Sequence, residues 1–146
     1  MNILKKLSVI IVTYNTAEKI ILDCLQSIQK DIKVLIVENS NNFLHEKIVK
    51  SRFPNTEIYC TGENLGYGEG NNYGLQKAEG DYALIINPDI ICDKDLFSNI
   101  SEVINETNDF SIIGCQYLHD KVFMPAGFFK KSKNEEFKKN FLNNNL

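Results

Sequence analysis

The sequence predicts an α/β fold built on a mainly parallel sheet flanked by helices. Short apolar runs rich in Val and Ile recur along the chain, which is typical of strands covered on both faces. The strong runs are residues 9–12, 34–37 and 83–86, and the weaker ones are residues 57–60 and 111–115. Helical patterns separate these runs. This alternation implies right-handed crossovers between parallel strands.

Three stretches between the runs have apolar residues at helical spacing. They are residues 20–28, 44–49 and 96–104. Asn15 and Glu18 have the spacing of a capping box at the start of the first stretch, and Asp93 is placed to cap the third. We therefore expect each of these stretches to form a helix that packs on the sheet.

The composition excludes several classes of protein. The 146 residues are 43% hydrophobic and 24% charged, and the net charge of −3 argues against a general nucleic-acid binder. The cysteines are far apart in sequence with no CxxC pair, which predicts buried or half-buried thiols in a reducing cytosol, not disulfides or a zinc site. They are Cys24, Cys60, Cys92 and Cys115. No apolar run is long enough for a signal peptide or a membrane span, so we expect a cytoplasmic protein, with peripheral attachment at the inner membrane as the alternative.

Polar residues follow the three strong apolar runs. They are Thr13-Tyr14-Asn15, Glu38-Asn39-Ser40 and Asn87-Pro88-Asp89. In open α/β sheets, ligands bind beyond the carboxyl ends of the strands, so these segments indicate a binding site. Tyr14 is suited to line a base pocket, Glu38 to accept a hydrogen bond from a pyrimidine N–H or a ribose hydroxyl, and Asp89 to bind Mg²⁺ or Mn²⁺. The alternatives are a helix cap at Asn15, a solvated strand end at Glu38 and a plain turn at Asp89.

The stretch 64–74 contains four glycines in nine residues. We expect a loop whose backbone approaches a ligand, because glycine tolerates close approach and sharp turns. The spacing GxGxGxxxG and the position after a weak run argue against a dinucleotide-binding fingerprint. His45 and His119 stand in unrelated contexts, which argues against a histidine metal site, and the sequence has no GxSxG, HExxH or P-loop motif.

The ordered set VIIVTYN, VENS, NLGYGEGNNYG and INPD resembles family 2 glycosyltransferases of the GT-A fold, especially their rhamnosyltransferase-like branch. The likeness extends over residues 7–118. It implies an inverting enzyme that takes a sugar from a UDP- or dTDP-sugar donor. The acceptor would be a saccharide or a lipid-linked molecule in surface polysaccharide biosynthesis.

The resemblance also implies roles for individual residues. The nucleotide-sugar-binding set would be Thr13, Tyr14, Asn15, Glu38, Asn39, Asn64, Gly66, Asn71 and Asn87. Asp89 stands in the family's DxD motif and would bind the Mg²⁺ or Mn²⁺ ion that stabilises the leaving diphosphate. Glu38 replaces the usual aspartate, and Asn87 replaces the first acid of the motif.

The family's catalytic base is an acid well downstream of this motif. Between Lys121 and Leu146 the only acids are Glu135 and Glu136, in a Lys- and Asn-rich context that does not match. We therefore expect no catalytic base in this chain, a base beyond Leu146, and slow transfer by the chain alone. Residues 1–120 would form the nucleotide-sugar-binding GT-A domain, and residues 121–146 a basic tail or the start of a missing acceptor half.

Two other functions are compatible with parts of the sequence. The first is a catalytically incomplete assembly module, a pseudoenzyme or fragment that needs a partner chain. Apolar surface left exposed by a missing half would favour a homo-oligomer in that case. The second is a nucleotidyltransferase, which would normally carry a glycine-rich, basic phosphate loop after the first strand. That strand instead leads into Thr13-Tyr14-Asn15.

Overall fold

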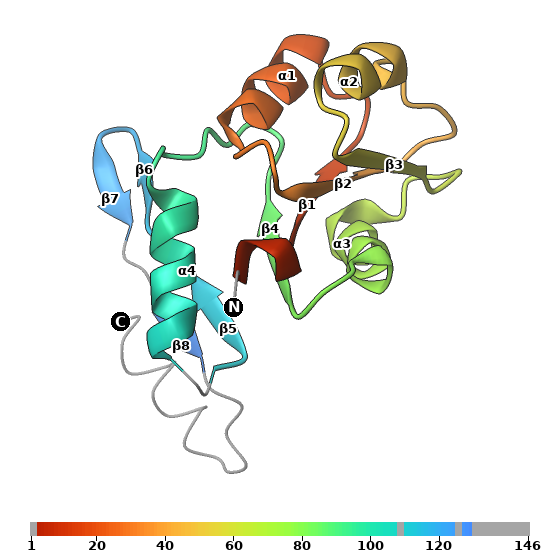
Figure 1. Ribbon diagram of the computed structural model, residues 1–146. Coiled ribbons are helices and arrows are strands. Elements are labelled where there is room, and N and C mark those ends of the chain that lie inside the picture. Colours follow the sequence, from red (N-terminus) through yellow and green to blue (C-terminus); the bar gives the residue numbers. More distant parts are fainter. Residues whose placement is uncertain (1–2, 108–109, 125–126, 130–146) are drawn as a thin grey trace, which may run out of the picture. The chain divides into compact units, whose positions relative to one another are not determined.

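The structure of the chain is a computed structural model that describes residues 3–107, 110–124 and 127–129 (Figure 1). The chain divides into two compact units, Met1–Glu102 and Val103–Leu146. The first unit contains the parallel sheet and the three polar segments that follow its strands. The described residues include no helix long and apolar enough to cross a membrane.

A four-stranded parallel sheet forms the centre of the first unit, as predicted. Its strands are β1 (Leu7–Thr13), β2 (Lys33–Glu38), β3 (Thr56–Cys60) and β4 (Tyr82–Ile86), in the order β3-β2-β1-β4. A short 3-10 helix, Ile3–Lys6, precedes β1. The register pairs Thr13 with Glu38, so the carboxyl ends of β1 and β2 lie level. Every residue of β1 is buried, which matches the apolar run 9–12 at its centre, and the polar Ser8 and Thr13 near its ends are buried as well.

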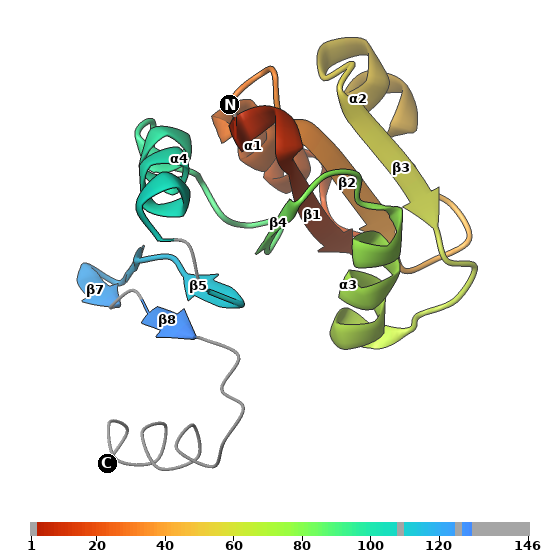
Figure 2. The ribbon, with the colours of Figure 1, turned by 60° about the horizontal axis from the view of Figure 1, so that its bottom comes forward.

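Helices cover both faces of this sheet. Helices α1 (Glu18–Ser27) and α2 (Glu46–Arg52) lie on one face and α3 (Gly66–Lys77) lies on the other (Figures 1 and 2). The main hydrophobic cluster joins Ile21 and Leu25 of α1 to alternate residues of the strands, among them Val9 and Ile11 of β1. The first two predicted helices are therefore confirmed.

The glycine-rich stretch forms helix α3, so the predicted loop is wrong. Gly66, Gly70 and Gly74 recur every fourth residue and so share one face of the helix. A Cβ atom at Gly74 would lie 2.6 Å from Cγ2 of Ile10, and one at Gly70 would lie 2.8 Å from Cγ1 of Val12. Gly70 and Gly74 are needed because α3 packs directly on β1, with no room for a side chain at either position.

The predicted cap at Asn15 is also wrong. Helix α1 begins after Ala17, which makes no side-chain cap bond. Asn15 instead has a φ of 49° and forms part of the turn between β1 and α1. Asparagine tolerates this left-handed conformation better than most residues. At the third predicted helix, α4 (Leu96–Glu106), the Asp93 carboxylate does accept the Asp95 N–H at 2.9 Å.

Several apolar or cysteine positions are more exposed than predicted, among them Ile85, Cys60 and Leu44. Strand β4 forms one edge of the sheet, and Ile85 is 40% exposed, so this run is not covered on both faces. Cys60 lies at the end of the opposite edge strand and is exposed. Leu44 precedes α2 and is also exposed. Edge position, which a single strand does not reveal, accounts for the first two differences.

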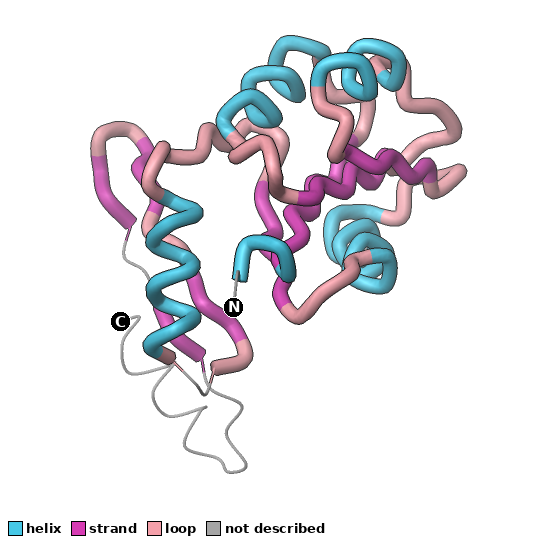
Figure 3. The backbone as a smooth tube through the Cα atoms, in the orientation of Figure 1, coloured by secondary structure: helices cyan, strands magenta, loops and turns pink. Residues whose placement is uncertain are grey.

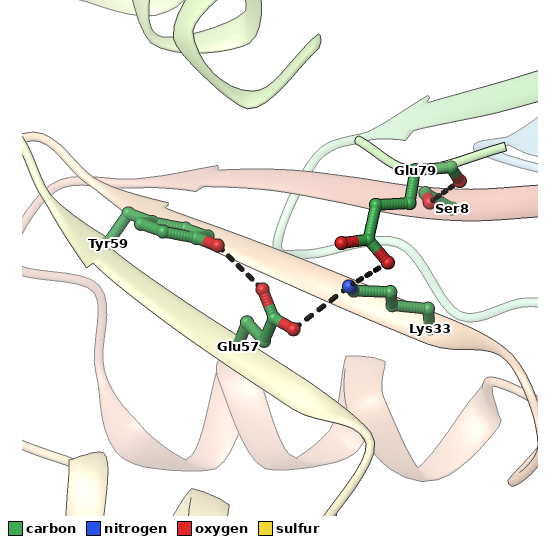
Figure 4. A network of polar contacts seen from close by, with 5 residues as sticks. All are labelled: Ser8, Lys33, Glu57, Tyr59 and Glu79. Carbon is green, nitrogen blue, oxygen red and sulfur yellow. Dashed lines mark hydrogen bonds and ion pairs between the residues drawn. The ribbon is translucent and has the colours of Figure 1, made fainter. Parts of the chain in front are cut away.

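A polar network joins the strands near their amino ends (Figure 4). The Lys33 ammonium group lies 2.9 Å from carboxylate oxygens of both Glu57 and Glu79. The Tyr59 hydroxyl donates to Glu57 at 2.6 Å, and the Ser8 hydroxyl donates to the Glu79 carbonyl at 2.9 Å. The hydrogen bonds to Glu57 and Glu79 raise the pKa of Lys33. The network connects β1, β2, β3 and the α3–β4 loop, and it extends along β3 from Glu57 to Tyr59, which pairs with Val37.

The second unit contains two antiparallel strand pairs, whose strands are drawn as short magenta segments in Figure 3. Strand β5 (Ile112–Gly114) pairs with β8 (Gly127–Phe129), and β6 (Tyr117–His119) pairs with β7 (Val122–Met124). Asp120 and Lys121 both have positive φ, the conformation of a two-residue hairpin turn. The Lys- and Asn-rich tail, residues 130–146, lies outside the described residues.

Candidate functional site

The candidate site begins with the Glu38 carboxyl group at the end of β2. Its Oε2 accepts the Thr13 hydroxyl at 2.6 Å, and its Oε1 accepts the Asn15 backbone N–H at 3.2 Å. Glu38 is only 2% exposed and Thr13 only 1%. The carboxyl group therefore holds the β1–α1 turn in place. Glu38 is not the solvated strand end that the sequence left open as an alternative.

Asn39 connects this strand end to helix α3. Its backbone N–H donates to the Thr13 carbonyl at 2.8 Å, and its side-chain amide donates to the Gly66 carbonyl at 2.9 Å. The Asn64 side chain accepts the Gly66 N–H at 2.9 Å just before the helix. The structure thus brings Asn39, Asn64 and Gly66 together, and all three shape the start of α3.

Asn71 lies one turn further along α3 and is buried, with 6% of its surface exposed. Its amide N–H donates to the Tyr67 carbonyl at 2.9 Å. Its side-chain oxygen has no hydrogen-bond partner among the described residues. A buried acceptor without a donor lowers the stability of the folded protein, so we expect a ligand or a water molecule to donate a hydrogen bond to this oxygen.

A pocket opens beside the Glu38 carboxyl group. Its volume is about 230 Å³. Its walls come from the β1–α1 turn, the end of β2 and the segment before α2; the lining residues are Asn15, Thr16, Ala17, Glu38, Asn42, Phe43, Leu44 and His45. Tyr14 does not line this pocket, and its side chain is 55% exposed.

Only two of the residues that line the pocket, Asn15 and Glu38, were predicted as site residues; the others are Thr16, Ala17, Asn42, Phe43, Leu44 and His45. Thr61 was missed too: its N–H and its hydroxyl both reach the Glu38 carbonyl, at 3.0 Å and 3.2 Å. No motif marks these positions. The only sequence signal was that the segment after the second strong run must lie near the segment after the first, because their strands are neighbours.

Asn87-Pro88-Asp89 lies at the end of β4, and both Asn87 and Asp89 are exposed. Helix α1 is close to this turn, because the buried Cys24 thiol lies 3.9 Å from the Asn87 carbonyl oxygen. Burial, and to a smaller extent Cys92 and Asp89, raises the pKa of Cys24 to about 12, so this thiol stays protonated. Cys24 therefore acts as part of the core.

Strands β1 and β4 flank the point where the strand order reverses, since the chain runs outward from β1 to β2 and β3 and then returns to β4 on the other side. Ligands of open α/β sheets bind at such switch points. Within the described residues no group of three or more His, Cys, Asp or Glu side chains is arranged to hold a metal. An ion at Asp89 would therefore need most of its ligands from a bound molecule and water.

Known proteins share parts of this sequence and fold. The chain is 28% identical over 88 residues to the minor teichoic acid biosynthesis protein GgaB of Bacillus subtilis (strain 168), a match that covers 58% of this chain and 10% of GgaB. The crystal structure of S. aureus TarS 1-349 is similar with a TM-score of 0.67 and 24% identity, covering 82% of this chain and 38% of that one. TarS 1-349 in complex with UDP gives a TM-score of 0.68 with the same identity and coverage.

The structural likeness confirms the predicted GT-A-like α/β fold. The chain spans well under half the length of these relatives. Neither relative's name bears on the rhamnosyltransferase-like branch, which stays a prediction. The sequence model described as "Glycosyl transferase family 2" matches residues 8–145, nearly the whole chain. The chain therefore belongs to glycosyl transferase family 2.

Proposed function

We propose that this chain binds the nucleotide-diphospho-sugar donor of an inverting glycosyltransferase, with the base and ribose beside Glu38. The observation that carries the proposal is the Glu38 carboxyl group, which is buried at a strand end and lines the pocket. An ionised carboxylate offers about four lone-pair positions, and Thr13 and Asn15 occupy two of them. The others remain for a pyrimidine N–H or a ribose hydroxyl.

The relatives support the choice of donor and of pathway. TarS has been crystallised with UDP, and GgaB is named for teichoic acid biosynthesis. We therefore propose a UDP-sugar as the donor, with a dTDP-sugar as the alternative. The acceptor would be a saccharide or lipid-linked precursor of a cell-surface polymer. The rest of the proposed nucleotide-sugar set consists of Thr13, Tyr14, Asn15, Asn39, Asn64, Gly66, Asn71 and Asn87.

We propose Asp89 as the protein's metal ligand. It is exposed at the switch point of the sheet and offers a hard carboxylate oxygen, the donor that Mg²⁺ and Mn²⁺ prefer. One carboxylate fits an ion that is bound mainly through the diphosphate of the donor. When bound, the ion would supply Lewis-acid stabilisation of the leaving diphosphate. Asn87 would lie beside it, toward the ribose or a metal-bound water.

Donor binding is proposed for residues 1–120. We propose that transfer by this chain alone is slow, because the acids between Lys121 and Leu146 do not match the sequence context of the family's catalytic base. An alternative role as an assembly module is favoured by the exposed apolar side chains of Ile85 and Ile91 on and after β4. Light scattering separates the two roles: self-association at micromolar concentration supports assembly, and a monomer that binds nucleotide supports donor binding.

The experiment is a calorimetric titration of the chain with UDP, dTDP and GDP, each with and without Mn²⁺. We expect UDP to bind in a Mn²⁺-dependent way and Asp89→Ala to weaken this binding by about tenfold or more, since a charged contact is lost. Asp31→Ala is the matched control, because Asp31 is exposed just before β2 at the other end of the sheet, and it should not change the affinity. Failure of all three nucleotides to bind under either condition would contradict the proposal.

A further inference from the structure

We infer that His45 is a positioning residue of the pyrimidine-binding pocket. Its contacts with the β1–α1 segment hold the β1–α1 turn against the start of α2. The inference rests on the proposed function, because it assigns His45 to the pocket beside Glu38. It concerns base recognition only, and not the diphosphate or the metal.

The imidazole ring of His45 lies between two acceptors of the opposite segment. Its Nε2 is 3.1 Å from the Thr16 carbonyl oxygen, and its Nδ1 is 3.3 Å from Oε2 of Glu18. Both partners can only accept when Glu18 is ionised, so each contact requires an N–H on the ring. A neutral ring carries a single N–H and donates to only one of the two acceptors, the Thr16 carbonyl in the turn or the Glu18 carboxylate at the start of α1, whereas a protonated ring donates to both.

The surroundings of His45 fix the ring in this place. Its side chain is 19% exposed. The Phe43 ring packs edge-on against it, with centroids 5.7 Å apart and an interplanar angle of 88°. Phe43 is itself only 4% exposed and belongs to the hydrophobic core. Phe43, a residue of the hydrophobic core, thus restricts the position of the imidazole ring. The contacts of His45 therefore connect the β1–α1 turn to the core.

His45 and Glu38 hold the same turn from two sides. Glu38 accepts the N–H of Asn15, and His45 contacts the carbonyl of Thr16, the next residue. All four residues line the pocket of about 230 Å³. Loss of the His45 contacts would leave this wall of the pocket free to shift, and a ligand would then have to order it at an entropic cost. Pyrimidine binding should weaken, whereas metal–diphosphate binding at the end of β4 should not.

The test is a calorimetric titration of the full chain with two ligands, UDP and pyrophosphate, both with Mn²⁺. We expect His45→Ala to weaken UDP binding by about tenfold, the value of one hydrogen bond, and to leave pyrophosphate binding unchanged. His45→Gln places an amide N–H near the position of Nε2 and should recover most of the UDP affinity. His119→Ala, at the exposed second histidine, is the matched control and should have no effect.

Equal losses for UDP and pyrophosphate would overturn the inference, because they would indicate a general structural role. UDP affinity in His45→Ala equal to that of the wild type would also overturn it. A wild-type chain that binds pyrophosphate but not UDP would instead overturn the proposed base site. A ligand-free measurement then still decides on His45: amide hydrogen exchange over residues 14–20 should be faster in His45→Ala than in His119→Ala, and unchanged exchange would refute the positioning role.

Discussion

Glu38 shows how a single side chain can belong to both the fold and the site. Its two carboxylate oxygens accept hydrogen bonds from Thr13 and Asn15, and its backbone carbonyl accepts the Thr61 N–H. The sequence predicted the place of Glu38, because this residue directly follows the apolar run 34–37. It did not predict that the carboxylate would hold the left-handed turn at Asn15, since that contact depends on the register of β1 against β2.

The first prediction concerns Glu38→Gln. The amide group can accept one of the two hydrogen bonds but must turn its NH₂ group toward the other donor. We expect this buried mismatch to lower the free energy of unfolding by about 1–3 kcal/mol and to weaken UDP binding. Urea unfolding and calorimetry measure the two effects. Glu102→Gln, at an exposed position of α4, is the control and should change neither; an unaltered Glu38→Gln variant would contradict the role given to this carboxyl group.

At the scale of elements, strands β1 and β2 could be predicted because short, continuous runs rich in Val and Ile are typical of strands buried on both faces. Helix α3 could not be predicted by the same reasoning, because four glycines ordinarily lower helix stability. The signal was present in a different form: Gly66, Gly70 and Gly74 share one helical face. The cost at Gly70 and Gly74 is offset by close packing of α3 on β1, which only the assembled sheet reveals.

The second prediction compares two glycines of α3. Gly74→Ala would place a Cβ atom 2.6 Å from Cγ2 of Ile10, whereas a Cβ atom at Gly68 would meet nothing within 4 Å. We expect Gly74→Ala to lower the free energy of unfolding by about 1 kcal/mol, because overpacking outweighs the gain in helix propensity. Gly68→Ala should raise it by about 1 kcal/mol. Thermal and urea unfolding check this, and equal stabilisation by both substitutions would show that α3 does not pack closely on β1.

At the scale of the molecule, the site lies where parallel strands end and where the strand order reverses. The sequence predicted that three polar segments lie together at this edge, since strands that run parallel bring their carboxyl ends to one edge of the sheet. It could not show how far the edges of the sheet are exposed, nor that Phe43 and His45 form a wall of the pocket, because those facts depend on neighbours distant in sequence. The roles of the individual site residues stay predictions.

The central claim is that a pyrimidine nucleotide binds at the carboxyl ends of β1 and β2. Chemical-shift mapping of the ¹⁵N-labelled chain with UDP and Mg²⁺ tests it most directly. A second pocket, of about 400 Å³ and lined by Leu4, Lys5, Gln29, Asp31 and Asn55, lies near the amino ends of the strands and serves as an internal control. We predict that the largest shifts fall on residues 13–17 and 38–45. Shifts concentrated on the second pocket, or no shifts at saturating UDP, would contradict the account.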